Sequence, residues 1–310
     1  MTLQHTILIT NDDGVEAQGL AELVQGLHDA GYPLIICAPD RERSASTMHL
    51  TLHKLLRLRE RNDLLSRYVI DDSGSPIWMF DVSGYPADCI LTAIGGGLPD
   101  HLPKPSLCIS GINRGPNMSV DVLHSGTIGG ARQAATAGLP AISTSLDSFE
   151  SADFQVAVKA TLELVGRLCK IIPVEPSNLG RVHGSSLKSN GDSDEELLRE
   201  AINNGDVFLN LNVPVDWAGE FSSTHLGGRW YREHIRIVDK KEGEWMIKLG
   251  SEHIEDDPLD NSDTLCVSLG RASVSTLGTW PQGHPLSVSD EVLSRTINTD
   301  GLPEWLLKRD

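Results

Sequence analysis

The sequence predicts an α/β protein with a mostly parallel sheet and a β-rich C-terminal extension. Apolar, β-branched runs at residues 6–10 and 34–38 predict two buried strands. Between them, apolar residues recur at helical spacing over residues 20–27, and Gly31 closes that helix. A strand–helix–strand unit with a short return is right-handed and makes its two strands parallel. From Trp217 onward the pattern changes to short alternating segments, which are typical of hairpins.

The chain has 310 residues, which is enough to bury a large core. We expect a single domain, with an α/β core over about residues 1–215 and an arm over about residues 216–310. The arm could pack on its own core or reach across to a partner subunit. The formal net charge of −17 argues against nucleic acid polymers and anionic membranes as partners, because both need basic surface. A small phosphorylated ligand stays compatible, since a metal ion and backbone amides supply local positive potential.

Five cysteines are scattered along the chain without a CxxC pair, and most lie in apolar runs. Such residues behave as small buried hydrophobes in a reducing compartment. The N-terminus lacks a basic-then-apolar signal pattern, and no apolar run is long enough to span a bilayer. We therefore expect a cytoplasmic protein.

Further elements follow from the same patterns. Helices are expected at residues 86–94, where Pro86 stands at the start, and at residues 154–170, where apolar residues recur at near-helical spacing. A charge-rich connection is expected at residues 57–67. Apolar or alternating runs predict strands at residues 48–58, 68–70, 77–82, 106–109, 141–145 and 206–213.

The second half begins with a polar insertion at residues 177–205, which we interpret as a surface loop with a short acidic helix at residues 194–202. Alternating segments then predict hairpin strands, and an acidic turn is expected at residues 251–263. Short helices are expected at residues 291–297 and 303–308. The predicted hairpin segments are residues 230–238, 245–249 and 264–277.

The first strand is followed at once by Asn11, Asp12, Asp13 and Gly14. Two adjacent carboxylates at the end of an apolar strand are unfavourable, because they repel each other and burial disfavours both charges. A divalent cation would neutralise them, and carboxylate oxygens suit hard cations such as Mg²⁺ or Mn²⁺. The alternative is a polar Asx turn that only caps the helix.

Polar clusters also follow two later strands, at residues 41–46 and 110–117. In a parallel sheet such turns emerge on one edge, where they can converge with Asp12 and Asp13 into a set of oxygen ligands. Ser125, Gly126 and Thr127 stand where a helix opens, a place that favours anions. An oxygen-ligated metal beside an anion site suits the hydrolysis of a phosphate ester.

Six motifs, in order, resemble the SurE family: NDDG (11–14), APDRERSAS (38–46), PADC (86–89), SGIN (110–113), GPN (115–117) and SGT (125–127). Later stretches at residues 209–214 and 262–277 resemble it more loosely. The resemblance implies a metal-dependent acid phosphatase, a 5′-nucleotidase, that hydrolyses nucleoside 5′-monophosphates. It also implies a Rossmann-like three-layer core and an arm exchanged between the subunits of a homodimer or homotetramer.

The resemblance also assigns roles to residues. One divalent ion per subunit, Mg²⁺ or Mn²⁺, would be held by four ligands, of which the two aspartates are also the catalytic residues. A second group would hold the phosphate. The implied metal ligands are Asp12, Asp13, Ser44 and Asn113. The implied phosphate-binding residues are Asn117, Ser125, Gly126 and Thr127.

Several roles stay open. An aspartate of the pair could act as the base for water or as a nucleophile. His49, His53 and His124 are candidate general acids by their ordinary pKa, although a single histidine is more often structural. Arg43, like Arg41, could steer an anionic substrate or be a solvated surface charge.

Two departures from the family pattern leave the base and sugar preference open. Tyr85 replaces a usual Thr, and His124 replaces a frequent Tyr. Two other functions are kept as alternatives: a nucleotide-sugar transferase, and a non-catalytic nucleotide-binding protein of the same fold. A dinucleotide-binding oxidoreductase is disfavoured, because the first strand leads into NDDGVEAQG and not into GxGxxG.

Overall fold

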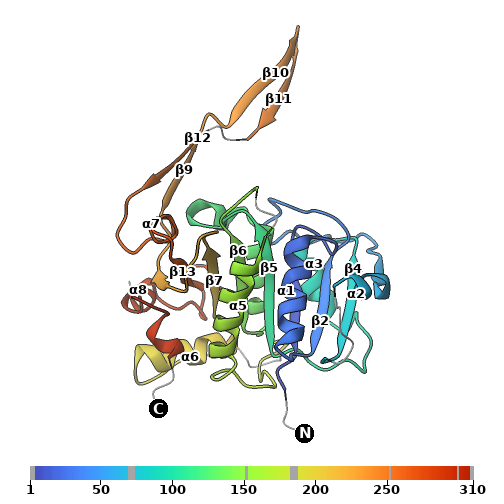
Figure 1. Cartoon of the computed structure of the whole chain (residues 1–310), viewed down its shortest axis with the longest axis vertical. Coiled ribbons are helices and arrows are strands. Elements are labelled where there is room, and N and C mark those ends of the chain that lie inside the picture. The colour runs from blue at the N-terminus through green and yellow to red at the C-terminus, as the bar shows by residue number, and fades with distance from the viewer. Residues whose placement is uncertain are drawn as a thin grey trace.

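The structure is a computed structural model, and it describes residues 4–68, 74–150, 153–181, 188–250, 253–298 and 300–307. A nine-stranded sheet runs through its centre in the order β3-β4-β2-β1-β5-β6-β7-β13-β8 (Figure 1). Its strands are β1 (Ile7–Thr10), β2 (Leu34–Pro39), β3 (Leu58–Glu60), β4 (Ile77–Val82), β5 (Leu107–Arg114), β6 (Ala141–Leu146), β7 (Val207–Val213), β8 (Phe221–Thr224) and β13 (Ala272–Gly278).

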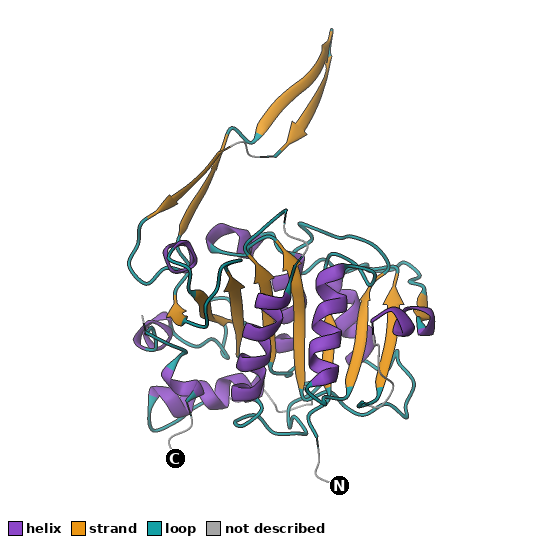
Figure 2. Cartoon of the chain, in the orientation of Figure 1, coloured by secondary structure: helices purple, strands orange, loops and turns teal. Residues whose placement is uncertain are grey.

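Helices cover both faces of this sheet, which makes three layers (Figure 2). One face carries α1 (Gln18–Asp29), α5 (Gln155–Leu168) and α6 (Asp194–Asn204), whose buried apolar side chains share one core with β1 and β7. The other face carries α3 (Pro86–Ile94) and α4 (Gly126–Thr136), which pack on a second core. The remaining helices are α2 (Asn62–Tyr68), η1 (Ser119–Leu123), α7 (Asp263–Ser268), α8 (Asp290–Arg295) and η2 (Glu304–Leu306). Among the described helices, none has both the length and the apolarity that a bilayer crossing requires.

The order of the strands creates a crevice beside β1. The chain places β2 and β4 on one side of β1, and then returns to place β5, β6 and β7 on the other. These six strands are mutually parallel, so their carboxyl ends lie on the same edge. The strand order therefore reverses between β1 and β5, and ligands of open α/β sheets bind at such a point. The predicted Rossmann-like three-layer architecture is confirmed.

Most predicted core elements are confirmed, but the charge-rich segment 57–67 is not a solvated connection. It contains β3 and α2, because its arginines pair with a buried carboxylate: Arg59 and Arg61 both bond to Asp81, which is fully buried. The strand expected at residues 48–58 is wrong apart from Leu58. Of the strand expected at residues 68–70, Tyr68 ends α2 and the other two residues lie outside the described residues.

The C-terminal arm also departs from expectation. The acidic turn expected at residues 251–263 instead contains β12 (His253–Asp257), which pairs antiparallel with β9 (Gly228–Arg232). The strand expected at residues 264–277 begins as helix α7, because the Ser262 hydroxyl caps it by accepting a hydrogen bond from the Leu265 N–H at 3.2 Å. The chain becomes extended again only at β13. The two short C-terminal helices correspond to α8 and η2.

A hairpin of β10 (Ile235–Lys241) and β11 (Glu244–Leu249) projects far from the sheet at the end of the β9–β12 ribbon (Figure 1). Every residue of both strands is exposed. Ile235 pairs across the hairpin with Leu249, and Ile237 pairs with Ile247. The hairpin therefore carries a row of aliphatic side chains that nothing in the described part of the chain covers.

We expect Asp81→Asn to lower the free energy of unfolding by about 3 kcal/mol, because it removes the buried negative charge with which Arg59 and Arg61 both pair. The matched control is Asp63→Asn. Asp63 bonds to the same Arg61 but is 59% exposed, so its loss should leave the free energy of unfolding almost unchanged. Urea unfolding of both variants measures the difference. Equal effects would contradict a structural role for the buried pair.

Candidate active site

The turn after β1 is fixed by its own side chains. Asn11 is fully buried, and its amide donates to the Gly14 carbonyl at 3.0 Å while its Oδ1 accepts from the Gly14 N–H at 3.2 Å. Gly14 has φ +100°, and a Cβ there would lie 2.9 Å from the Arg41 carbonyl carbon. Only glycine fits this conformation and this contact without strain. The turn therefore holds Asp12 and Asp13 at the carboxyl end of β1.

Asp12 is a buried carboxylate with no basic partner among the described residues. Its side chain is 3% exposed, and burial raises its pKa to about 6. Hydrogen bonds from the hydroxyl and the N–H of Thr127 act in the opposite direction. Asp13 is more accessible, and burial raises its pKa too, although the Arg114 N–H donates to its Oδ2 at 3.2 Å. The site therefore holds negative charge in a place that disfavours it.

Asn113 reaches Asp12 because β5 carries a bulge. Against β6, Ser110 is paired with Ser143 and Asn113 with Ser145, so β5 contains one more residue over this interval. The sequence places the end of this strand at Ile109, whereas β5 continues to Arg114. The Asn113 amide donates to the Gly115 carbonyl at 2.8 Å, and its Oδ1 accepts from the Thr127 hydroxyl at 3.2 Å. The bulge thus directs an oxygen ligand toward Asp12.

The residues present fit a hard cation. Beside Asp12 lies Ser46, whose Oγ is buried and makes no hydrogen bond within the described chain. A Cβ on Gly126 would lie 2.4 Å from Ser46 Oγ and 2.8 Å from Asp12 Oδ2, so the start of α4 packs directly against both. The donors are carboxylate, amide and hydroxyl oxygens, as Mg²⁺ and Mn²⁺ prefer. Among the described residues, no cluster of three or more His, Cys, Asp or Glu side chains competes with this set.

Ser125 begins α4, and its hydroxyl accepts from the Ile128 N–H at 3.1 Å. The capped start of this 11-residue helix faces Asp12 through Thr127. The positive end of the helix dipole therefore lies beside the candidate metal ligands. Ser125, Gly126 and Thr127 are brought together with Asp12 and Asn113, as the sequence predicts.

Asn117 is held by a buried amide network. Its side chain donates to the Ser145 hydroxyl at 2.8 Å, and its N–H donates to Asn212 Oδ1 at 2.7 Å. Its carbonyl accepts from the amides of Asn210 and Asn212. The sequence motifs assign no role to Asn210 and Asn212. Two amides at alternate positions of an apolar strand were the available signal, because buried amides require partners.

A pocket of about 220 Å³ opens over this cluster. Ser44 lines it, but its hydroxyl donates to Glu42 at 2.9 Å. His124 also lines it and is exposed. Three of the lining residues lie outside the polar clusters that the sequence predicts: Asp121, Phe149 and Tyr231. Tyr231 lies far along the chain on β9, in a segment the sequence analysis assigns only to a hairpin, so no local pattern identifies it.

The other charged candidates do not line this pocket. Arg43 donates to the Ser83 carbonyl at 3.1 Å and lies over the Tyr85 ring at 5.0 Å. His49 packs edge-on against the same Tyr85 ring, with 4.3 Å between centroids. His53 and Arg41 are likewise absent from the wall. Tyr85 therefore packs against the 41–46 loop through Arg43 and does not line the pocket.

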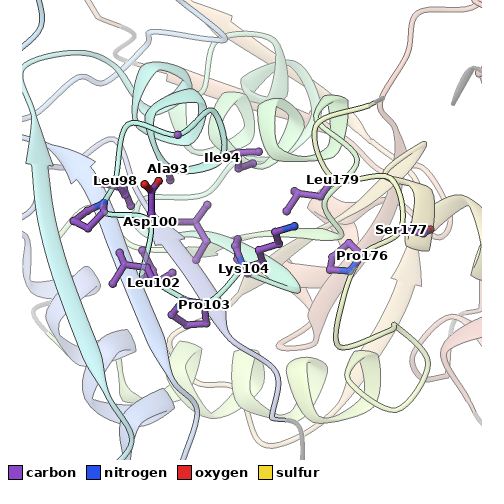
Figure 3. Close-up of a pocket in the computed structure, with 15 residues that line it drawn as sticks. Ala93, Ile94, Leu98, Asp100, Leu102, Pro103, Lys104, Pro176, Ser177 and Leu179 are labelled. Atoms are coloured by element: carbon purple, nitrogen blue, oxygen red, sulfur yellow. The ribbon is translucent and has the colours of Figure 1, made fainter. Parts of the chain in front are cut away.

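A larger cavity of about 490 Å³ lies at the opposite edge of the sheet, between the loop after α3 and residues 176–179 (Figure 3). Its walls are mostly leucine and proline, with one carboxylate, Asp100, and one ammonium group, Lys104. A single carboxylate does not provide the set of oxygen ligands that a divalent ion needs and that the residues around Asp12 offer. The smaller pocket at the strand carboxyl ends is therefore the candidate active site.

Comparison with known proteins identifies the family. The model of the family described as survival protein SurE matches residues 7–233. A protein named 5′-nucleotidase SurE from Synechococcus elongatus is 41% identical over 262 residues, 83% of this chain and 85% of its own. A protein of the same name from Gloeobacter violaceus is 32% identical over 275 residues, 87% of this chain and 89% of its own.

A solved structure agrees in fold. The crystal structure of the SurE protein from Aquifex aeolicus aligns with a TM-score of 0.63 at 23% identity, over 90% of this chain and 95% of that one. The matched region contains the crevice between β1 and β5, the bulge of β5 and the start of α4. The chain belongs to the SurE family.

Proposed function

We propose that this protein is a divalent-metal-dependent phosphatase that hydrolyses nucleoside 5′-monophosphates to nucleoside and phosphate. The observation that carries the proposal is the contact of Asp12, Asn113 and Thr127 at the reversal of strand order, beside the start of α4. It places uncompensated negative charge next to a helix N-terminus. The relatives are named 5′-nucleotidase, which supports the same activity.

Asp12, Asp13, Ser44 and Asn113 would hold one Mg²⁺ or Mn²⁺ ion. When bound, the ion supplies positive charge to a phosphoryl oxygen and lowers the pKa of a coordinated water. The other tasks would fall to the chain. The Thr127 hydroxyl lies within hydrogen-bond distance of both Asp12 Oδ1 and Asn113 Oδ1, which supports a common centre for these two oxygens. Asp13, the more accessible aspartate, would accept a proton from the attacking water.

The phosphate would lie at the start of α4, between Asn117, Ser125, Gly126 and Thr127. The helix dipole would favour the phosphate dianion there. It would also stabilise the negative charge that shifts as the bond to the leaving oxygen breaks. The amide network around Asn117 keeps that residue in one position, because Asn212 binds both its N–H and its carbonyl and Asn210 binds the same carbonyl. The cytoplasm suits the chain, since its five cysteines form no disulfide.

We expect phosphate release from nucleoside 5′-monophosphates in the presence of Mn²⁺ or Mg²⁺, and its loss after chelation with EDTA. Asp12→Asn should lower kcat by at least about 10³-fold, because it removes a ligand and a charge from the centre. A malachite green assay across the four common nucleotides measures both. Folded protein that binds nucleotide without releasing phosphate under any metal would contradict the proposal and favour a binding protein. Transfer of a phosphate-linked group without hydrolysis would favour the transferase.

The buried charge of Asp12 is expected to lower the free energy of unfolding when no metal ion is bound. Its pKa is about 6 in the folded protein against 3.8 in an unfolded chain, so folding favours the protonated form. The contribution of the protonated Asp12 carboxyl to the free energy of unfolding is fully present below pH 4 and is lost as the pH rises through 6. In EDTA at pH 7.5, we expect Asp12→Asn to raise the free energy of unfolding by about 2–3 kcal/mol. At pH 4 the gain should vanish.

Urea unfolding at the two pH values, with and without Mn²⁺, measures this. Mn²⁺ should stabilise the natural protein and not the variant, because an ion bound only by the folded state raises its stability. Asp29→Asn is the control, since Asp29 is 63% exposed on α1 and should show neither effect. A variant no more stable than the natural protein in EDTA at pH 7.5 would contradict an uncompensated charge at Asp12.

We also propose that the protein assembles as a homodimer or homotetramer through its arm. The support is the β10–β11 hairpin, whose aliphatic row is unburied within one chain: Ile235 is 56% exposed, Ile247 is 54% and Leu249 is 72%. Contiguous exposed apolar surface of this kind marks an interface. A second copy of the same hairpin would present a matching aliphatic row, as a symmetric interface requires.

Ile237→Ser combined with Ile247→Ser should dissociate the assembly into smaller species, because it places two hydroxyls opposite each other in the aliphatic row. Light scattering after size exclusion measures the molar mass. Arg236→Ser with Lys248→Ser is the control, since that pair lies opposite in the same hairpin at the alternate position. A monomeric natural protein, or a double variant of unchanged mass, would contradict the proposed interface.

A further inference from the structure

The lining of the active-site pocket includes aromatic residues that belong neither to the proposed metal ligands nor to the proposed phosphate-binding residues. Phe149 and Tyr231 line it together with Asp12, Asn113 and Ser125. Phe149 follows β6, whereas Tyr231 comes from β9 of the arm. We propose that Phe149 and Tyr231 form the nucleobase subsite, with Asp121 and Arg229 as the residues that position Tyr231. This inference rests on the proposed function.

Phe149 has a largely exposed aromatic ring. Its side chain is 65% exposed, although it lines a pocket. One edge is fixed against the backbone, because a Cβ on Gly115 would lie 2.3 Å from Phe149 Cε1. Gly115 thus allows this edge of the ring to approach the turn after β5 closely. A base stacked on the exposed ring would remove apolar surface from water without any particular hydrogen-bonding pattern.

Tyr231 is held by hydrogen bonding and not by apolar packing alone. Its hydroxyl donates to Asp121 Oδ1. Burial and the neighbouring Asp121 carboxylate raise the pKa of Tyr231 well above its ordinary value, so the hydroxyl stays protonated and keeps donating at neutral pH. The ring therefore occupies one position over the pocket before any ligand arrives. A pre-positioned ring loses little conformational freedom when a base stacks on it.

Arg229 connects this wall to the arm. It makes two bonds of 2.8 Å to Asp256 on β12 and a longer contact of 3.4 Å to Asp121. Its own N–H donates to the Ser119 hydroxyl at 2.8 Å, which ties β9 to the 3₁₀ turn that carries Asp121. The guanidinium also offsets the charge of Asp121, which would otherwise repel an incoming phosphate. Asp121 and Arg229 thus act through Tyr231.

Phe149 and Tyr231 are two aromatic rings that line one pocket, and such rings suit a flat ligand. A nucleobase is the part of a nucleoside monophosphate with that shape, whereas ribose and phosphate need donors and acceptors. The contribution should therefore appear in KM and not in kcat, because stacking is present equally in the ground state and the transition state. It should also be absent for a substrate that has no base.

The test compares AMP with ribose 5-phosphate in the full-length protein with Mn²⁺. Phe149→Ala should raise KM for AMP about tenfold, the loss expected when one stacked ring is removed, with kcat changed less than about twofold. Tyr231→Leu should act in the same direction. Tyr231→Phe keeps the ring but loses the bond to Asp121, so its effect should be smaller. For ribose 5-phosphate, KM, or Ki if it is not hydrolysed, should stay unchanged in all three variants.

Trp230→Leu is the matched control, because Trp230 precedes Tyr231 on β9, is half-exposed and does not line the pocket. Equal losses for AMP and ribose 5-phosphate would overturn the subsite and leave a structural role. Unchanged KM for AMP would also overturn it. If the natural protein releases no phosphate, the proposed function fails separately. Calorimetric binding of AMP to the natural protein and Phe149→Ala then decides the subsite, since tenfold weaker binding supports it and equal binding overturns it.

Discussion

The buried carboxylate of Asp12 is the constraint on which the rest of the site depends. A charge that is 3% exposed, with no basic partner among the described residues, is stable only if something else supplies positive potential. The fold supplies part of it through the start of α4 and the donors of Thr127. The proposed metal ion would supply the remainder. The tight turn at Gly14 and the close packing of Gly126 on Asp12 serve the same end, because each fixes the carboxylate in place.

Three separate pieces of chain meet at this point, and the sheet brings them together. The turn after β1 brings the aspartates, the bulge in β5 brings Asn113, and the start of α4 brings Thr127. None of these contacts is local in sequence: Thr127 bonds to a residue 115 positions earlier. A parallel sheet achieves this because all its strands end on one edge, and the reversal of order beside β1 leaves a space between two of those ends.

Much of this was accessible from the sequence, for identifiable reasons. Short buried strands followed at once by acidic or glycine residues predict both the sheet and the location of the site, as at Asp12 and Asp13. The failures have equally specific causes. Arg59 and Arg61 resemble solvated charge until Asp81 is placed beneath them, which depends on the pairing of β3 with β4. Asn210 and Tyr231 reach the site from distant strands, so only the three-dimensional structure shows their proximity to Asn117 and Asp121.

The ribbon that carries Tyr231 continues without a break into the projecting hairpin, with three residues between Tyr231 and Ile235. Whatever orders the hairpin also restricts the motion of the pocket wall. If a second copy covers the hairpin, then occupancy of the pocket and association of the chains share one structural element. Linkage requires the effect to be mutual: each event changes the affinity for the other by the same factor. Substrate affinity in such a molecule becomes a function of how much of the protein is present.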